Sequence, residues 1–474
     1  MTDTLAVAIA VQDLELKNAD GSNKFTSTGT LPTHGDGGPE NLTNMDDRLD
    51  DQGHHSGSSN FTTDEKRHTL QFGADQTGTS SNNNSESVKK SRPPLLKQQV
   101  RLEGRPTILK KLASAMPKVE LHVHLEGTLD PELVFALAQR NDIDLTPHFK
   151  DEDDLRSRYE SFTDLNSFLD VYYRCASVLC TEQDFYELTM AYFAKAKQNN
   201  IVYAEMFFDP QHHKEQRGLS FETCANGIIS AMNDAHSRYG IQSKLIPCFL
   251  RHLPEASAKA TWIEIFKYMK SHPASKSKIV GVGLDSSEKK NPPRKFHGVF
   301  WMIRHASKGV VGDMHVVAHA GEEGPARYIT EALNLLHAER IDHGVQCVKD
   351  AKLVQRLREE NIPLTVCPLS NTRLKVFGHM KDHNLKRMLD LGLNVSIHSD
   401  DPAYFGSIND NYFAIIDAFD MDELDVLTLA RNAVQSSFMS NREKRRLCQR
   451  IYDDATPFLD RLVELDAALS VIVE

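Results

Sequence analysis

Two histidines separated by one residue stand in the segment Glu120–Thr128, which reads ELHVHLEGT. The run is short and apolar, so it predicts a β-strand that ends at Gly127. Because side chains in a strand alternate between its two faces, His122 and His124 point to the same side. Two imidazoles on one face can hold a metal ion, although the same pattern also fits two histidines on a solvated face.

Three further motifs place polar side chains at the ends of apolar runs. They read HAGEE with His319 and Glu322, RIDHG with His343, and HSDDP with Asp400 and Asp401. Three imidazoles and one carboxylate suit zinc and leave one position open for water. Zinc lowers the pKa of bound water from about 15.7 to roughly 7, which predicts hydrolysis near neutral pH. A structural zinc closed by four ligands is the alternative, but it would not need Glu322 and His343 nearby.

The remaining polar groups have predicted roles. Glu322 follows His319 by three residues, across a glycine turn, and can protonate the atom that gains electron density as water attacks. His343 can orient the water or stabilise its charge, although a core histidine bonded to backbone would also fit. Asp400 and Asp401 are adjacent, so on an extended backbone they point in different directions. One of them can bind the metal while the other contacts the substrate.

Strand-like and helix-like segments alternate from Lys118 onward. The eight strand-like runs are Val119–Leu125, Ile201–Asp209, Lys244–Leu250, Ile279–Leu284, His315–Ala320, Arg340–Val345, Leu364–Pro368 and Asn394–Ser399. Segments between them, such as Asp184–Asn199 and Phe221–Arg238, have helical periodicity. Eight strands alternating with helices predict an α/β fold, a closed parallel (β/α)8 TIM barrel. The active site of such a barrel lies at the C-terminal ends of the strands, where the polar motifs fall.

The segments outside the alternation predict additions to the barrel. Pro131–Thr181 interrupts the first two strands and predicts extra helices that cap the barrel mouth. Asp422–Glu474 predicts terminal helices. Before about Ser91, small polar residues dominate without apolar periodicity, which is typical of a disordered tail. We therefore expect a tail and linker over 1–100 and one metal-dependent barrel domain over 101–474.

Composition limits the class of protein further. The chain has 474 residues and a net charge of −11, which argues against a nucleic-acid partner. No run of about 18 apolar residues is present, so no membrane-spanning helix is expected. The seven cysteines are scattered without a C-x-x-C pair, which predicts thiols in a reducing compartment. We expect a cytoplasmic protein, with a nuclear pool left open; the oligomeric state has no signature in the sequence.

The motifs as a series resemble those of a known family. ELHVHLEGTL, HAGEEG, RIDHG, VCPLSN and SDDPAYFG are similar, in the same order, to the motifs of the adenosine/adenine deaminases of the amidohydrolase superfamily. The resemblance extends from Met116 to about Ser440. It implies one zinc ion on His122, His124, His319 and Asp400. It further implies Glu322 as proton donor, His343 as the group that aligns or deprotonates water, and Asp401 as the residue that meets the imidazole ring of a purine.

Within the family, the adenine deaminase branch is the better match. FFDPQ (Phe207–Gln211) and GLDSSE (Gly283–Glu288) resemble that branch, whereas adenosine enzymes usually have a D-L-A-G-type turn after strand four. The bulkier polar groups from Asp285 to Glu288 should crowd a ribose and leave room for a free base. The adenine pattern usually has Asn where this chain has His398. By strand alternation His398 faces the same side as Asp400, so it can lie beside the zinc and change its water; a substitution without effect is the alternative.

The resemblance predicts hydrolysis of adenine to hypoxanthine and ammonia, as in purine salvage. Water adds at carbon 6, Glu322 protonates nitrogen 1, and Asp401 bonds nitrogen 7. The alternatives are adenosine or N6-substituted adenine as substrate, or a non-catalytic barrel that acts as a binding module. The completeness of the site argues against the binding module. The other zinc deaminase fold requires P-C-x-x-C, which this chain lacks.

Overall fold

The computed structural model describes residues 94–307 and 309–473; the predicted tail before residue 94 lies outside the described residues. Eight parallel strands follow one another around one sheet in chain order. They are β1 (Lys118–His124), β2 (Ile201–Phe208), β3 (Gln242–Leu250), β4 (Gly281–Asp285), β5 (His315–Ala320), β6 (Arg340–His343), β7 (Leu364–Val366) and β8 (Val395–Ile397). The prediction of a (β/α)8 barrel is confirmed.

The barrel closes between β8 and β1 through residues that were predicted to bind metal. Asp400, just beyond β8, pairs with Val123 as an isolated parallel bridge. The Asp400 N–H donates to the His122 carbonyl, and the His124 N–H donates to the Asp400 carbonyl, both at 3.0 Å. The closing seam therefore fixes the backbone of three candidate ligands.

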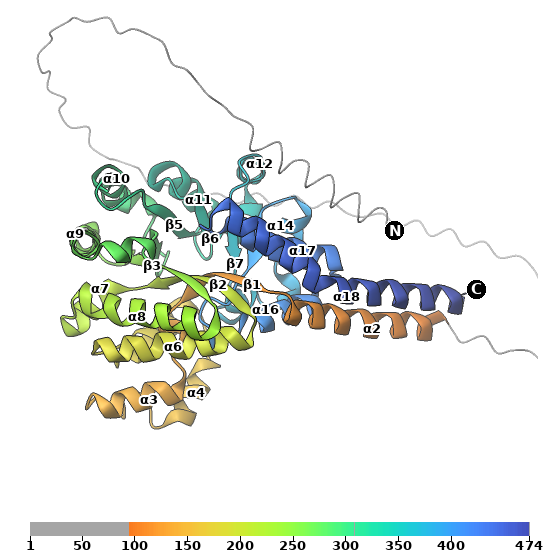
Figure 1. Ribbon diagram of the computed structural model, residues 1–474, viewed down its shortest axis with the longest axis horizontal. Coiled ribbons are helices and arrows are strands. Elements are labelled where there is room, and N and C mark those ends of the chain that lie inside the picture. The colour runs from red at the N-terminus through yellow and green to blue at the C-terminus, as the bar shows by residue number, and fades with distance from the viewer. Residues whose placement is uncertain (1–93, 308, 474) are drawn as a thin grey trace, which may run out of the picture. The chain divides into compact units, whose positions relative to one another are not determined.

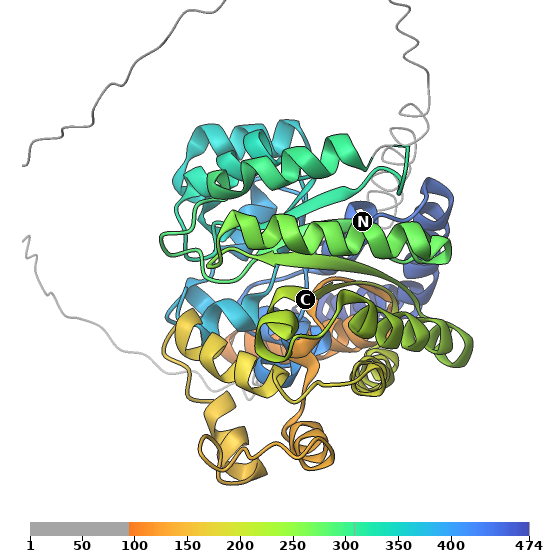
Figure 2. The ribbon, with the colours of Figure 1, turned by 90° about the vertical axis from the view of Figure 1, so that its left-hand side faces the viewer.

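Helices surround the strands, as Figures 1 and 2 show. The helices that follow the strands in the outer layer include α8 (Phe221–Tyr239), α9 (Glu255–Ser271), α10 (His297–Ala306), α11 (Ala326–Glu331), α12 (Ala351–Glu359), α14 (Leu385–Asp390) and α17 (Glu423–Ser436). On α8, the apolar residues Phe221, Cys224, Ile228 and Met232 are buried. Their spacing of three to four residues gives the helix one apolar face, which packs on the barrel.

Short helices begin within a few residues of the ends of three strands, each at a proline. They are α7 (Pro210–Arg217), α13 (Pro368–Arg373) and α15 (Pro402–Phe405). Proline fits the first turn of a helix because it needs no N–H donor there, but it cannot continue a strand ladder. The residues before these prolines are Asp209, Cys367 and Asp401. The three prolines thus keep the preceding reactive side chains at the C-terminal face of the barrel.

The segment between β1 and β2 is helical, as predicted. It contains α3 (Pro131–Arg140), α4 (Glu152–Tyr159), α5 (Leu165–Ala176) and α6 (Glu182–Gln198). Phe168 on α5 packs against Tyr404 and Phe405, with ring centroids 5.1 and 5.0 Å away. Leu165, Phe168 and Tyr173 line a cavity at the barrel mouth. Helix α5 therefore forms an apolar wall beside the polar strand ends.

Two long helices near the ends of the described chain lie side by side, α2 (Pro94–Ala115) and α18 (Asn441–Val473) (Figure 1). Arg105 on α2 forms ion pairs with Glu423 and with Asp466, the latter at 3.4 Å. The domain boundary predicted at residue 100 falls inside α2. Among the described residues, no helix is long and apolar enough to cross a membrane.

Candidate active site

The four predicted metal ligands lie together at the C-terminal face of the barrel. One nitrogen or oxygen atom of each of His122, His124, His319 and Asp400 lies within 4.8 Å of the others. Asp400 Oδ1 is 3.2 Å from His122 Nε2 and 3.5 Å from His124 Nε2, and the Nε2 atoms of His124 and His319 are 3.2 Å apart. All four residues are buried, and His122 Nε2 has no hydrogen-bond partner among the described residues. The donors therefore fit a metal ion.

Polar groups on β6 and β7 orient two of the imidazoles. His122 Nδ1 lies 3.0 Å from the Thr365 hydroxyl, and His319 Nδ1 lies 3.4 Å from Asp342 Oδ2. The Thr365 hydroxyl donates to Asp342 Oδ1 at 2.8 Å. Burial alone would raise the pKa of Asp342, but the hydrogen bond and charge of His319 and the charge of His122 lower it well below its usual value. An ionised Asp342 directs the Nε2 atoms towards a metal, as carboxylates behind histidine ligands do.

The pKa shifts of His124 and Asp400 favour metal binding, whereas for His122 burial is outweighed by the charge and hydrogen bond of Asp400, which raise its pKa. Burial lowers the pKa of His124 to about 3, and the charge of His319 acts in the same direction. Burial would raise the pKa of Asp400, but the charges of His122 and His343 hold it well below its usual value. Neutral imidazoles and ionised carboxylates are the forms that bind metals.

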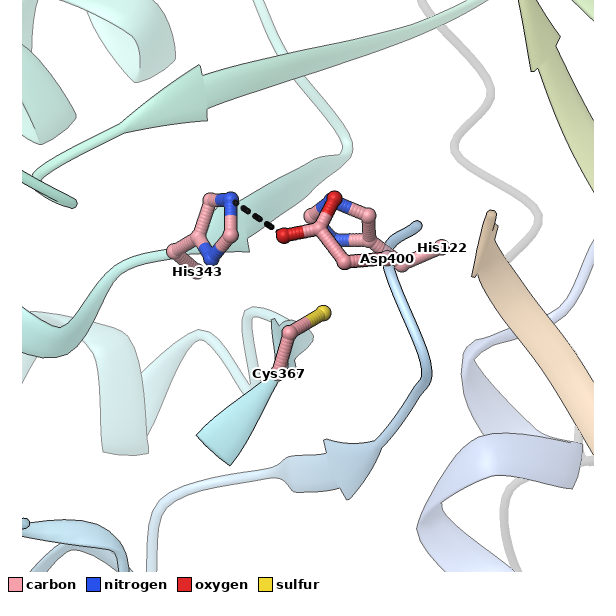
Figure 3. Close-up of side chains that lie close together, drawn as sticks. All are labelled: His122, His343, Cys367 and Asp400. Carbon is pink, nitrogen blue, oxygen red and sulfur yellow. Dashed lines mark ion pairs between the residues drawn. The ribbon is translucent and has the colours of Figure 1, made fainter. Parts of the chain in front are cut away.

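A second donor set shares two of these residues and consists of His122, His343, Cys367 and Asp400. Figure 3 shows the Cys367 thiol pointing from the end of β7 towards the Asp400 carboxylate. Burial raises the pKa of Cys367 well above its usual value. A metal ion at Cys367 would first have to displace the thiol proton, whereas imidazoles and a carboxylate match the donors of a catalytic zinc site. The set of three imidazoles and one carboxylate is the favoured one.

Glu322 and His343, the predicted proton-transfer residues, lie beside Asp400. His343 Nε2 is 3.7 Å from Glu322 Oε2 and 3.7 Å from Asp400 Oδ2; the latter contact is dashed in Figure 3. The Asn371 amide of α13 lies 3.4 Å from Glu322 Oε1 and 3.3 Å from His343 Nδ1. Burial and then the charge of Asp400 raise the pKa of Glu322 well above its usual value. Burial lowers the pKa of His343, so a neutral acid stands beside a neutral base.

Asp401 lines the same cavity and packs against Gly127. A Cβ on Gly127 would lie 1.8 Å from Asp401 Oδ1, so only glycine leaves room for the carboxyl group. Burial and the charge of Asp400 raise the pKa of Asp401 well above its usual value. Asp401 Oδ1, the oxygen that packs against Gly127, has no hydrogen-bond partner among the described residues.

Three residues of the cavity wall have left-handed backbone conformations. The φ angles are +73° at Ser286, +62° at His343 and +64° at Asp400. Residues other than glycine rarely adopt this conformation, and such strain is concentrated at functional sites. The extended backbone predicted at Asp400 is therefore wrong, although Asp400 and Asp401 still make different contacts.

His398 does not lie among the metal donors, which corrects the interpretation based on strand alternation. Its Nδ1 accepts a hydrogen bond from the Leu121 N–H at 3.0 Å and lies 3.2 Å from Glu120 Oε1, and its Nε2 lies 2.7 Å from the Ser396 hydroxyl. The alternation fails because β8 ends at Ile397 and the backbone leaves the extended conformation at Asp400. His398 instead joins the end of β8 to β1.

The polar turn after β4 was expected to crowd a ribose, but Glu288 does not point into the cavity to do so. Its carboxylate accepts hydrogen bonds from the backbone N–H groups of Gly321, Glu322 and Gly324 at 2.9, 3.0 and 2.6 Å. The Arg251 guanidinium lies 3.6 Å from Glu288 and donates to the His319 carbonyl at 2.6 Å. This buried pair holds the loop that carries Glu322 under the cavity.

Several polar residues of the site were missed at the sequence level. Asp209 follows β2 and was missed, and Asp285 ends β4 and was predicted only as part of a polar turn that crowds a ribose, although both satisfy the strand-end rule. Asn371 stands in the VCPLSN motif, from which no role was assigned. Asp342 gave no signal, because it lies within a strand and contacts other side chains.

An eight-stranded barrel with three imidazoles and a carboxylate at its strand ends, beside a buried acid, defines the amidohydrolase class of hydrolases. Sequence comparison agrees with this class. The adenosine deaminase family model matches residues 117–454. Adenine deaminase of Cupriavidus taiwanensis is 51% identical over 329 residues, which are 69% of this chain and 89% of that protein. Adenine deaminase of Ralstonia nicotianae is 49% identical over 340 residues, 72% of this chain and 94% of that protein.

Two solved structures give the same result. Adenine deaminase from Arthrobacter aurescens is 46% identical with a TM-score of 0.66, over 72% of this chain and 99% of that one. A zinc-bound amidohydrolase from Burkholderia ambifaria is 26% identical with a TM-score of 0.67, over 75% of this chain and 94% of that one. The chain belongs to the adenosine deaminase family, in the adenine deaminase branch of the amidohydrolase superfamily.

Proposed function

We propose that this chain hydrolyses adenine to hypoxanthine and ammonia with one bound zinc ion, an activity of purine salvage. The observation that carries the proposal is the site itself. A buried acid, Glu322, and a buried base, His343, lie next to a four-donor metal group in a chain about half identical to adenine deaminases. The substrate is accordingly a small purine base.

His122, His124, His319 and Asp400 would hold the zinc ion. Nitrogen and oxygen donors of this kind suit zinc, and the related amidohydrolase from Burkholderia ambifaria has zinc bound. When bound, zinc lowers the pKa of a coordinated water to about 7, which makes a nucleophile at neutral pH.

The residues of the chain move the protons. His343, which is neutral, accepts a proton from the attacking water. Glu322, which is protonated, gives its proton to nitrogen 1 of the base, so negative charge does not build up on the ring. Protonated Asp401 donates to nitrogen 7 and fixes the orientation of the base. His343 then gives the proton that it took from water to the amine, the bond between carbon 6 and the amine breaks, and ammonia leaves. The ionised Glu322 takes the proton of the added hydroxyl as the carbonyl of hypoxanthine forms.

We also propose a cytoplasmic location and a domain that starts near residue 101. All seven cysteines lie in the described part of the chain and none forms a disulfide, which is typical of a reducing compartment. The nuclear pool stays a prediction.

The function is tested by ultraviolet absorbance with adenine, adenosine and N6-methyladenine, together with the zinc content of the purified protein. We expect adenine to be the best substrate and about one zinc per chain. Zinc without deamination of any of the three would instead support the binding module. A clear preference for adenosine or N6-methyladenine would replace adenine as the substrate.

A further inference from the structure

Two buried aspartates share the cavity with the proton-transfer residues, and the chemistry proposed above does not use them. Asp209 follows β2 and is 2% exposed, and Asp285 ends β4 and is 1% exposed. Both line the cavity that also contains Glu322 and Asp401. Asp209 Oδ1 and both oxygens of Asp285 are buried, and the hydrogen bonds that the two carboxyl groups make are with each other and, for Asp285, with the Cys248 thiol. Two buried carboxyl groups this close share one proton, and the pair therefore keeps acceptor oxygens at the cavity wall to which a ligand N–H can donate.

The two carboxyl groups form one cluster close to the metal donors. Oxygens of Asp209 and Asp285 and a ring nitrogen of His124 lie within 4.8 Å of one another. The wall beside them is held by Ser286, whose hydroxyl lies 3.3 Å from the Tyr173 hydroxyl and 2.8 Å from His252 Nδ1. The cluster comes from β2 and β4, whereas Asp401 follows β8, so it meets a different edge of a base in this cavity.

Different nitrogens of a purine would contact different carboxyl groups of the cavity. In the proposed function, Glu322 and Asp401 contact nitrogens 1 and 7, the two nitrogens that flank the reacting side of the base. The edge that remains carries nitrogens 3 and 9. In free adenine nitrogen 9 can carry a hydrogen, whereas in adenosine the same nitrogen is bonded to a sugar carbon. A carboxylate at this edge can therefore distinguish the two chemically.

We infer that Asp209 and Asp285 accept the hydrogen bond of the ring N–H at nitrogen 9, which makes them the residues that select a free base over a nucleoside. The inference rests on the proposed function. A nucleoside lacks this N–H and would leave the acceptor oxygens of the pair without a hydrogen bond from the substrate. Sites built to hydrogen-bond one group of a substrate reject analogues that lack it by about 10⁴–10⁵-fold. Selectivity of this kind does not depend on a clash with the ribose alone.

Asp285 also has a competing structural role. Its Oδ2 lies 3.7 Å from His124 Nδ1, so it can orient that imidazole for metal binding. Among the described residues, that ion pair involves Asp285 and not Asp209. The Asp209→Asn variant therefore separates substrate recognition from metal positioning.

The test compares adenine with 9-methyladenine, which lacks the N–H but carries no sugar. Wild type, Asp209→Asn, Asp285→Asn and the exposed control Asp313→Asn are assayed as zinc-loaded enzymes for kcat/KM and metal content. We expect wild type to prefer adenine by at least roughly 10³-fold. Asp209→Asn should lower kcat/KM for adenine by roughly 10- to 100-fold, leave 9-methyladenine nearly unchanged and retain the metal. Asp313→Asn should behave as wild type.

An unchanged preference for adenine in Asp209→Asn would overturn the inference. A parallel loss on both substrates together with loss of zinc would also overturn it, because that pattern belongs to a structural role. Calorimetric binding of hypoxanthine and 9-methylhypoxanthine to wild type needs neither a variant nor turnover. If hypoxanthine binds more tightly but no purine is deaminated, the proposed function fails while the recognition role stands. Equal binding of the two would refute the recognition role itself.

Discussion

Glu322 carries the most specific expectation at the scale of single residues. We expect Glu322→Gln to bind zinc as wild type does and to lose about 10²–10⁴-fold in kcat, because an amide cannot deliver a proton to nitrogen 1. The measurement is steady-state turnover of adenine together with metal analysis. Glu323→Gln is the matched control, since Glu323 is the next residue and forms an ion pair with Lys289 at 3.2 Å. Turnover within threefold of wild type in Glu322→Gln would remove Glu322 from the role of proton donor.

The contact between Gly127 and the Asp401 side chain gives a second prediction for a single residue. A methyl group there would lie 1.8 Å from Asp401 Oδ1, so Gly127→Ala must displace the Asp401 side chain. We expect kcat/KM for adenine to fall by at least about tenfold, with the metal retained, since Asp401 is not in the donor group. Gly378→Ala is the control, because its Cβ would meet no atom closer than 3.5 Å. Unimpaired Gly127→Ala would mean that Asp401 does not position the substrate.

At the scale of elements, the loop after α13 supports the acid through a buried histidine. His383 Nε2 lies 3.2 Å from Asn371 Oδ1, and its Nδ1 accepts a hydrogen bond from the Leu385 N–H at 3.0 Å. Asn371 in turn contacts Glu322 and His343. The neutral form of His383 therefore holds the amide that positions both proton-transfer residues.

The pKa of His383 gives a prediction about pH. Burial lowers it from 6.5 to about 3. Between these values the unfolded chain binds a proton that the folded chain does not, so stability present above about pH 6.5 is lost as the pH falls towards 3. The loss is about 1.4 kcal/mol per pH unit. In urea unfolding between pH 7 and pH 5, the wild type should lose stability faster than His383→Gln, whereas the exposed control His379→Gln should follow the wild type. Parallel curves for wild type and His383→Gln would contradict the shift.

The elements also show how far the sequence predicts this molecule. The strand His315–Ala320 was predicted with the bounds the structure has, because its apolar run and its ends are local properties. The predicted ligands come together because parallel strands in a barrel bring their C-terminal ends to one face. The predicted locations of Glu288 and His398 were wrong. Both side chains bond backbone N–H groups of neighbouring elements, and the sequence does not show which of those groups lack a hydrogen bond. Asp342 and Asn371 act on other side chains, which a pattern along one strand does not reveal.

At the scale of the whole molecule, the same residues supply the metal donors and close the barrel. The donors come from β1, β5 and the segment just beyond β8. There Asp400 also makes the backbone hydrogen bonds that join this segment to β1. The Nε2 atoms of His124 and His319 lie 3.2 Å apart, and His122 Nε2 has no hydrogen-bond partner among the described residues. A metal therefore satisfies buried donors at the seam where the sheet closes.

Removal of the metal should accordingly affect stability as well as turnover. A ligand at 1,000 times its Kd stabilises the folded state by about 4.1 kcal/mol. We expect dialysis against a chelator to abolish deamination and to lower Tm by several degrees, and zinc to restore both. Asp400→Asn should have a lower Tm than wild type even when zinc is present, because an amide is a weaker zinc ligand than a carboxylate. The comparison is thermal unfolding of wild type and Asp400→Asn with and without zinc. A wild-type Tm that does not respond to zinc would show that the barrel closes independently of its metal.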